Sequence, residues 1–267
     1  DGYGTSPRRG VEGLRGADTV MGSSSKLVLA CGWESGSHLQ AQNGTVGAAQ
    51  ATGARTGAYG LWLDNGDAWV SQAFSDPASG VTINLPCVGM SVSFYMQTYT
   101  NTADKPFIAA HRGTPNQMYV QWFQSGGNNH IRLCAGDTGT TQGPTVWDGT
   151  ANLSTATIYV LEIFTYNSSG ATATKNWPIR VKLFSNAGAL LDDSGWQMDT
   201  GGSTAYSTVN SCGLGPGHNT YNFVGTNEIV YDDLQVFYGP PARGGKILRM
   251  TPNAVGTDTA WVGDYLL

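Results

Sequence analysis

The segment of residues 227–238, Asn-Glu-Ile-Val-Tyr-Asp-Asp-Leu-Gln-Val-Phe-Tyr, constrains the fold of this chain more than any other segment. It is rich in β-branched and aromatic residues and is followed by Gly-Pro-Pro, so we predict a β-strand that ends sharply. Period-two alternation divides its side chains between two faces, with Val230, Asp232, Leu234, Val236 and Tyr238 on one and Ile229, Tyr231, Asp233, Gln235 and Phe237 on the other. Both faces are largely apolar. We therefore expect this strand in the middle of a sheet that is covered on both sides.

Each face of this predicted strand carries one carboxylate, Asp232 or Asp233. A buried carboxylate needs hydrogen-bond donors or a cation, so the pair either binds a calcium ion or has a structural role. Adjacent strand residues point in opposite directions, and both could ligate one ion only if the strand had a bulge. The sequence thus favours a structural acid pair, in which each carboxylate accepts hydrogen bonds from a loop or pairs with an arginine such as Arg55. We expect no cofactor and no metal site.

Strand-like segments recur along the chain and lie at residues 26–31, 58–64, 67–74, 81–85, 90–99, 106–111, 117–123, 130–134, 157–166, 177–184 and 189–191. Asn65-Gly66 separates two of them and predicts a β-hairpin, because a type I′ turn needs two residues that tolerate positive φ. A polar segment at residues 137–149 is predicted to be a loop. No segment has a helical apolar period over three turns, so the fold class is all-β, with two packed antiparallel sheets in a sandwich or jelly roll.

The two ends of the chain differ in composition from its centre. We predict an extended N-terminal arm at residues 1–24, the sandwich at residues 25–239, and a linker and docking tail at residues 240–267. Neither end has enough apolar side chains to form a core of its own, so each is expected to become ordered against another subunit. Four side chains of the tail are expected to be buried between subunits: Ile247, Met250, Trp261 and Tyr265.

Composition and motifs exclude several classes of function. The net charge of −5 and the pI near 5.2 argue against a nucleic-acid partner, and no segment is long and apolar enough to predict a membrane partner. The four cysteines lack the spacing of a zinc site; disulfides and free buried thiols both stay open. No Gly-x-Ser-x-Gly or His-Glu-x-x-His motif and no glutamate pair on one strand face is present, so we expect no enzyme, although an aspartate pair from different strands stays open.

Aromatic side chains are the better candidates for binding. If Met90 and Met118 face the core, alternation turns Tyr95, Tyr99, Tyr119 and Phe123 outward. Exposed aromatic rings on a sheet stack on sugar rings or anchor a protein interface. The alternative is that these rings form a second, covered core.

Three short motifs resemble the concanavalin A-like (laminin-G-like) jelly-roll proteins of tailed-phage virions. They are Arg-Thr-Gly-Ala-Tyr-Gly-Leu at residues 55–61, Tyr-Asp-Asp-Leu-Gln-Val at residues 231–236, and Gly-Lys-Ile-Leu-Arg-Met-Thr-Pro-Asn at residues 245–253. The resemblance spans about residues 25–265. It implies a concanavalin A-like jelly roll that serves as a virion surface or tail component, with glycan contact as an option, and it does not imply an enzyme.

The first hypothesis is therefore a non-enzymatic structural protein located in a phage virion, as a capsid decoration or tail component. Its partners would be copies of itself and other virion proteins, which it would contact through its termini and aromatic faces. The alternative is a carbohydrate-binding adhesin or receptor-binding module with a cell-surface glycan as partner. A polysaccharide-cleaving enzyme is the third hypothesis.

Overall fold

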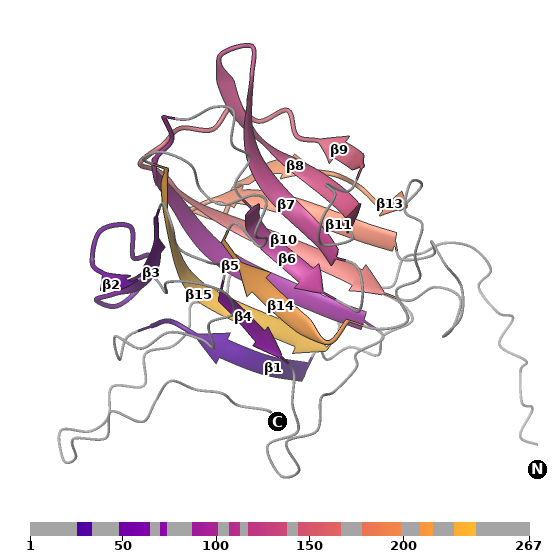
Figure 1. The fold of residues 1–267 in the computed structure, drawn as a ribbon, viewed down its shortest axis with the longest axis horizontal. Helices are drawn as coiled ribbons and strands as arrows, with labels where there is room; N and C mark the ends of the chain where they lie inside the picture. Colours follow the sequence, from indigo (N-terminus) through magenta and orange to yellow (C-terminus); the bar gives the residue numbers. More distant parts are fainter. Residues whose placement is uncertain are drawn as a thin grey trace, which may run out of the picture.

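The structure, a computed structural model, describes residues 26–33, 48–64, 70–73, 87–100, 107–112, 117–137, 144–166, 178–198, 209–215 and 227–238. These residues form two antiparallel β-sheets that pack face to face, and none of them is helical (Figure 1). The predicted all-β, two-sheet antiparallel sandwich is confirmed. The predicted arm (residues 1–24) and tail (residues 240–267), with Ile247, Met250, Trp261 and Tyr265, lie outside the described residues, so their predicted contacts stay predictions.

Sheet A, the larger of the two, has nine strands. They are β1 (Lys26–Cys31), β2 (Ala48–Gln50), β3 (Gly60–Leu63), β5 (Cys87–Thr98), β10 (Ile158–Tyr166), β11 (Pro178–Ser185), β12 (Leu190–Asp193), β13 (Gln197–Met198) and β15 (Glu228–Tyr238). Their order is β12-β11-β10-β5-β15-β3-β2, and β13 pairs with β11. Two strands share one edge of β15, since β3 pairs with its first half and β1 with its second half. The prediction that β15 lies in the middle of a sheet is therefore confirmed.

Sheet B has six strands in the order β4-β14-β6-β7-β8-β9. They are β4 (Val70–Ala73), β6 (Phe107–Arg112), β7 (Gln117–Ser125), β8 (Asn128–Asp137), β9 (Thr145–Asp148) and β14 (Ser211–Leu214). Strand β9 lies inside the segment predicted to be a loop, so that prediction is wrong for these four residues. Strands β2, β13 and β14 were not predicted because runs of two to four residues carry too little alternation to be recognised.

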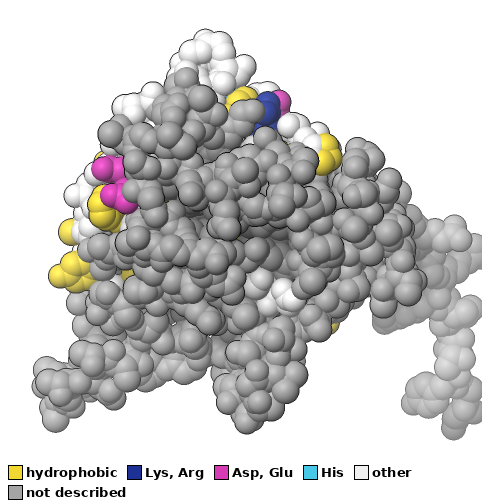
Figure 2. Space-filling view, in the orientation of Figure 1, with side chains coloured by type: hydrophobic (Ala, Val, Ile, Leu, Met, Phe, Trp, Pro, Cys, Tyr) yellow, Lys and Arg dark blue, Asp and Glu magenta, His cyan; other side chains and the backbone are white. Residues whose placement is uncertain are grey.

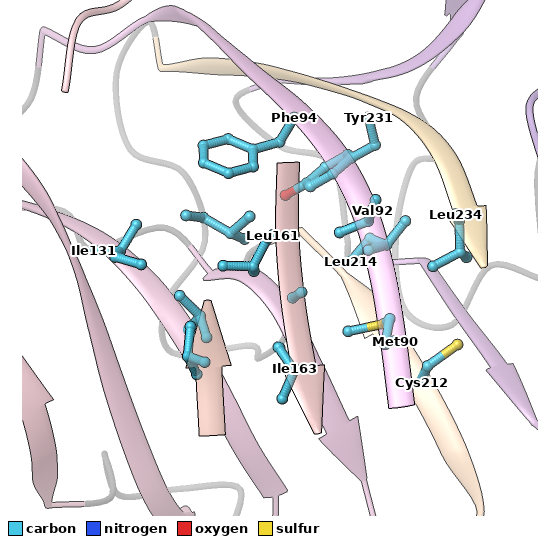
Figure 3. Close-up of a cluster of buried hydrophobic side chains, with 14 of the residues drawn as sticks. Met90, Val92, Phe94, Ile131, Leu161, Ile163, Cys212, Leu214, Tyr231 and Leu234 are labelled. Atoms are coloured by element: carbon cyan, nitrogen blue, oxygen red, sulfur yellow. The ribbon is translucent and has the colours of Figure 1, made fainter. Parts of the chain in front are cut away.

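The core fills the space between the sheets. Met90, Val92 and Phe94 of β5 enter it from sheet A, and Ile131 and Leu214 enter it from sheet B (Figure 3). These side chains are at most 1% exposed. Removing a large aliphatic or aromatic side chain of this kind from water contributes about 1.5–3 kcal/mol, so the two sheets are held together mainly by apolar burial.

Strand β15 departs from simple alternation in its middle. Ile229 and Tyr231 lie in the core, and so do Leu234 and Val236. Tyr231 and Leu234 are three residues apart, yet both enter the core (Figure 3). The register shifts between Asp232 and Gln235, and Asp233 has a φ of 51°. A β-bulge therefore reverses the two faces, and the predicted assignment of the side chains to faces is wrong on one side of it.

The predicted hairpin at Asn65-Gly66 is also wrong. The strands that flank it exist, but β3 belongs to sheet A and β4 belongs to sheet B. The reason is that β3 already has β15 on one side and β2 on the other, so both edges of its backbone are hydrogen-bonded. The predicted strand at residues 81–85 lies outside the described residues.

Two further results concern the whole described part of the chain. Cys87, Cys134 and Cys212 are buried, reduced thiols, so for these three residues the second of the two alternatives left open by the sequence holds. Among the described residues there is no helix long and apolar enough to span a membrane.

Candidate functional site

The acid pair of β15 holds the loop of residues 51–59 against the sheet. One oxygen of Asp232, Oδ2, accepts hydrogen bonds from the backbone N–H groups of Arg55 at 2.8 Å and Thr56 at 2.9 Å. Asp233 accepts a 2.5 Å hydrogen bond from the Thr56 hydroxyl and forms a 3.2 Å ion pair with the Arg55 guanidinium. These are the contacts that the structural interpretation of the pair predicts, including the arginine.

The bulge is what brings the two carboxylates together. With φ of 51° at Asp233, consecutive side chains no longer point to opposite faces, and both reach the same loop. Aspartate tolerates the left-handed conformation better than most residues because its short polar side chain bonds locally. The backbone N–H of Asp233 donates to Asp232 Oδ1 at 2.7 Å.

Burial of Asp232 raises the pKa of its carboxyl from the ordinary 3.8 to about 7, and the negative charge of Asp233 adds to the rise. The three backbone N–H donors oppose this rise because they stabilise the charged form. Asp232 and Asp233 are 1% and 2% exposed. The pair is thus a buried structural fastening of the loop rather than an accessible site.

The loop of residues 51–59, which joins β2 to β3, lies on the face of sheet A that points away from the core (left in Figure 1). Its Gly53 has a φ of +84°, and a Cβ there would come within 2.7 Å of the Tyr95 ring. Beside Tyr95, Gln50 donates to Gln97 at 2.7 Å, and Gln97 donates to Glu228 at 2.6 Å. One end of this outer face therefore combines a half-buried ring with a chain of planar polar groups.

Tyr99 does not share that face with Tyr95. Strand β5 ends at Thr98, and the Tyr99 ring packs on the core side with its centroid 6.1 Å from that of Trp122, in an edge-to-face arrangement. The prediction that Tyr99 turns outward is therefore wrong, because alternation cannot be extended past the end of the strand.

Tyr119 and Phe123 lie on the outer face of sheet B, but they are 0% and 6% exposed. The predicted exposure of this pair is wrong, and the alternative in which these rings are buried holds. The Arg132 guanidinium lies 4.2 Å from the Phe123 ring centroid and forms two hydrogen bonds with Asp148. Because the rings are covered, they offer little surface to a ligand.

A different aromatic group lies at the other end of the outer face of sheet A. We call Phe164, Tyr166 and Trp196 the aromatic corner. Phe164 and Tyr166 project from β10, while Trp196 comes from the turn between β12 and β13, and ring centroids in the corner are 5.3 to 6.1 Å apart. Phe164 is buried at 5% exposure, whereas Tyr166 and Trp196 are half-buried. Two rings thus present part of their surface to solvent on an apolar base.

An ion pair adjoins the aromatic corner. Arg180 faces Phe164 in the ladder between β10 and β11, and its guanidinium donates to both oxygens of Asp193, at 2.9 and 2.6 Å. The hydrogen bond from Arg180 lowers the pKa of Asp193 below its ordinary value, against the effect of burial. The two side chains are 29% and 23% exposed. Donor and acceptor groups therefore lie near the rings at the protein surface.

The turn that carries Trp196 is firmly attached to β11. Asp193 Oδ1 accepts a 2.9 Å hydrogen bond from Gly195 N–H, and the Ser194 backbone donates to Val181 at 2.9 Å. The Ser194 hydroxyl accepts a further bond from Val181 N–H. Gly195 has a φ of +60°, which glycine adopts without strain and which lets the chain turn between β12 and β13. The aromatic corner is therefore preorganised in the ligand-free protein.

Sequence reasoning missed the aromatic corner. Phe164 and Tyr166 stand two apart in a predicted strand, opposite the core residue Ile163, and that alternation was a usable signal. No sequence signal pointed to Trp196, because it lies in a turn. Its ring is brought to the other two rings by the pairing of β11 with β12 and β13.

Among the described residues visible in Figure 2, a basic side chain lies next to an acidic one near the top, and acidic side chains lie beside hydrophobic ones at the left rim. Among the described residues, no group of three or more His, Cys, Asp or Glu side chains is placed to hold a metal ion.

No family model and no curated protein matches the sequence of this chain. Among solved structures it is similar to domain 4 of AbnA, a GH43 extracellular arabinanase from Geobacillus stearothermophilus, in complex with arabinotriose, with a TM-score of 0.48 and 14% identity over 82% of this chain and 96% of that chain. It is also similar to Cellulose induced protein, Cip1, with a TM-score of 0.46 and 11% identity over 81% of this chain and 100% of that chain. A third similar structure is the marine PL-14 alginate lyase from Aplysia kurodai, with a TM-score of 0.45 and 7% identity over 67% of this chain and 82% of that chain. Similarities at this level assign no function to this chain.

Proposed function

We propose that this protein binds carbohydrate, without cleaving it, through the aromatic corner on the outer face of sheet A. The observation that carries the proposal is the contact between the half-buried rings of Tyr166 and Trp196, 5.3 Å apart and perpendicular, beside a partly exposed Arg180–Asp193 pair. Aromatic rings pack on the apolar faces of sugar rings, and nearby donors and acceptors bind the hydroxyl groups.

The fixed position of the Trp196 ring supports the same proposal. Trp196 is placed by hydrogen bonds from Ser194 and Gly195 to β11 and β12, and Phe164 supports it from below. A ring that is already ordered in the free protein loses little conformational entropy on binding, so more of the contact energy appears as affinity. A sandwich that presents such rings on one outer face suits an adhesin or receptor-binding module.

The test is a glycan array probed with the purified protein and with Trp196→Ala. We expect the protein to bind a defined set of glycans and the variant to lose at least about 10-fold in affinity for them. Tyr59→Ala is the matched control, because Tyr59 is an exposed ring (42%) on the loop of residues 51–59, which contacts Tyr95 and the acid pair at the other end of the face.

Circular dichroism and thermal unfolding show whether each variant remains folded. Binding that survives in folded Trp196→Ala, or an array without any bound glycan, would count against the proposal. If binding fell with Tyr95→Ala instead, the glycan site would lie at the predicted Tyr95 rather than at the aromatic corner.

Assembly with other chains, as in a virion, is a second candidate function, and one observation favours contact with another chain. Leu190 and Leu191 are 50% and 40% exposed on β12, which is the last strand in the order of sheet A. Adjacent exposed leucines on an edge strand are typical of a surface that another chain covers. Light scattering on the full chain at high concentration should then show a defined oligomer, and Leu190→Asp should dissociate it. A protein that is monomeric throughout would exclude assembly through this edge.

A further inference from the structure

Among the described residues, charge near the aromatic corner is balanced. Arg180 and Lys182 of β11 each have an acidic partner: Arg180 binds Asp193, while Lys182 faces the buried Glu162 in the ladder with β10. Lys182 is also close enough to Asp193 to help lower the pKa of that carboxyl. In the part of the chain that the structure describes, the corner is therefore flanked by Arg180 and Lys182 and by Glu162 and Asp193.

The geometry of the Arg180–Asp193 pair limits which ligands the Arg180 guanidinium can bind. A carboxylate or sulfate on a sugar binds an arginine best through the same two-bond arrangement that Asp193 already occupies. An acidic glycan would have to displace Asp193 from the Nε–Nη2 edge or bind the Nη1–Nη2 edge beside it, and in both cases the negative charge of Asp193 would lie next to that of the ligand. A neutral sugar avoids this conflict, because hydroxyl groups both donate and accept and leave the ion pair intact.

We propose that the aromatic corner selects neutral glycans and that Asp193 is the residue that excludes acidic ones. This inference rests on the proposed carbohydrate-binding function and adds the substrate class to it. Asp193 acts in two ways, since it neutralises Arg180 and orders the turn that carries Trp196 through Gly195 N–H. Tyr166 and Trp196 supply the apolar contact, which does not depend on ligand charge.

The experiment uses an array that contains neutral oligosaccharides, such as xylo-, arabino- and cello-oligosaccharides, together with uronate-containing and sulfated ones. We expect binding of the full chain to be confined to neutral glycans and to change less than about threefold between 50 and 500 mM NaCl, because no net charge is neutralised on binding. The bound neutral glycans should be those that Trp196→Ala loses.

Asp193→Asn tests the role of the charge. The asparagine oxygen still accepts from Gly195 N–H and Arg180, so the turn is retained while the negative charge is removed. We expect this variant to gain at least about 10-fold in affinity for uronate-containing glycans relative to neutral ones. Asp148→Asn is the matched control, because it removes the same kind of bidentate partner, that of Arg132, beside Phe123 on sheet B rather than at the corner, and it should change neither class.

The outcomes separate the two proposals. If no glycan on the array depends on Trp196, the carbohydrate-binding function fails and the inference fails with it. If binding depends on Trp196 but is strongest for acidic glycans, or if Asp193→Asn leaves the preference unchanged, only the inference about Asp193 is overturned.

Discussion

Among the described residues, the outer face of sheet A carries two arginine–aspartate pairs that differ in burial. At one end, the Arg55 and Asp233 side chains are 8% and 2% exposed, and Asp232 lies beside them. At the other end, the Arg180 and Asp193 side chains are 29% and 23% exposed and adjoin half-buried aromatic rings. The same two residue types therefore serve different purposes: the first pair fastens a loop, and the second can meet a ligand.

Burial explains the difference. In the first pair, removing any contact leaves a buried donor or charge without its partner, so the cost in free energy of unfolding is large. Burial also makes these groups inaccessible to a ligand. In the second pair water screens the charges and can replace lost hydrogen bonds. An ion pair by itself thus says little about function until the exposure of its members is known.

The largest expected effect is that of Asp233→Ala. The change removes the ion pair with buried Arg55 and the acceptor of the Thr56 hydroxyl, and it places alanine at a φ of 51°. We expect the free energy of unfolding to fall by about 3–5 kcal/mol in denaturant titrations. Asp233→Asn keeps an oxygen acceptor and a residue that tolerates this φ, so it should lose clearly less. Equal losses in the two variants would mean that charge alone matters.

The next effect is a dependence of stability on pH. Asp232 has a pKa of about 7 in the folded protein and an ordinary value of 3.8 in the unfolded chain, so the folded state binds more protons between these values. The contribution of Asp232 to the free energy of unfolding is fully present below pH 4. It is lost as the pH rises to 7, which lowers the free energy of unfolding by at most about 4 kcal/mol. Asp193 has the opposite sign, because its pKa is lowered and its contribution is lost in acid.

This pH dependence is measured by unfolding at several pH values between 4 and 8. Asp232→Asn should abolish the decrease between pH 4 and 7, and Asp193→Asn should retain it. A wild-type stability that rises with pH over this range would show that the backbone donors, rather than burial, dominate the pKa of Asp232.

A smaller loss is expected for Asp232→Ala. The backbone N–H groups of Arg55, Thr56 and Asp233 lose their acceptor, which should lower the free energy of unfolding by about 1–3 kcal/mol. Because the pair is satisfied by protein donors, thermal unfolding of the wild type should not respond to calcium or to a chelator. A melting temperature that drops on chelation would contradict the structural role of the acid pair.

The smallest effect on stability is expected for Asp193→Ala. Its ion pair with Arg180 is partly exposed and the Gly195 N–H can turn to water, so we expect a loss of about 1 kcal/mol or less. Differential scanning calorimetry beside Asp233→Ala gives the comparison directly. A loss as large as that of Asp233→Ala would show that the two pairs do not differ in the way their burial indicates.

The candidate site was predictable only in part. Asp232 and Asp233 were recognised because a charged group inside an apolar strand needs a partner. The predicted arginine partner, Arg55, forms an ion pair with Asp233. Tyr99 and Phe123 were placed wrongly because alternation assigns a side chain to a face but does not show where a strand ends or what covers the face. The aromatic corner was missed since Trp196 lies outside any strand.

The sequence by itself determined the existence of the long strands, the all-β class and the central position of residues 228–238, because apolar alternation and β-propensity are properties of neighbouring residues. Only the tertiary structure decided that β3 and β4 belong to different sheets, that a bulge turns Asp232 and Asp233 toward one loop, and that Trp196 meets Phe164 and Tyr166. Each of these depends on which distant strand takes up a backbone edge. That choice is made by the packing of the two sheets as a whole, and no local pattern of residues records it.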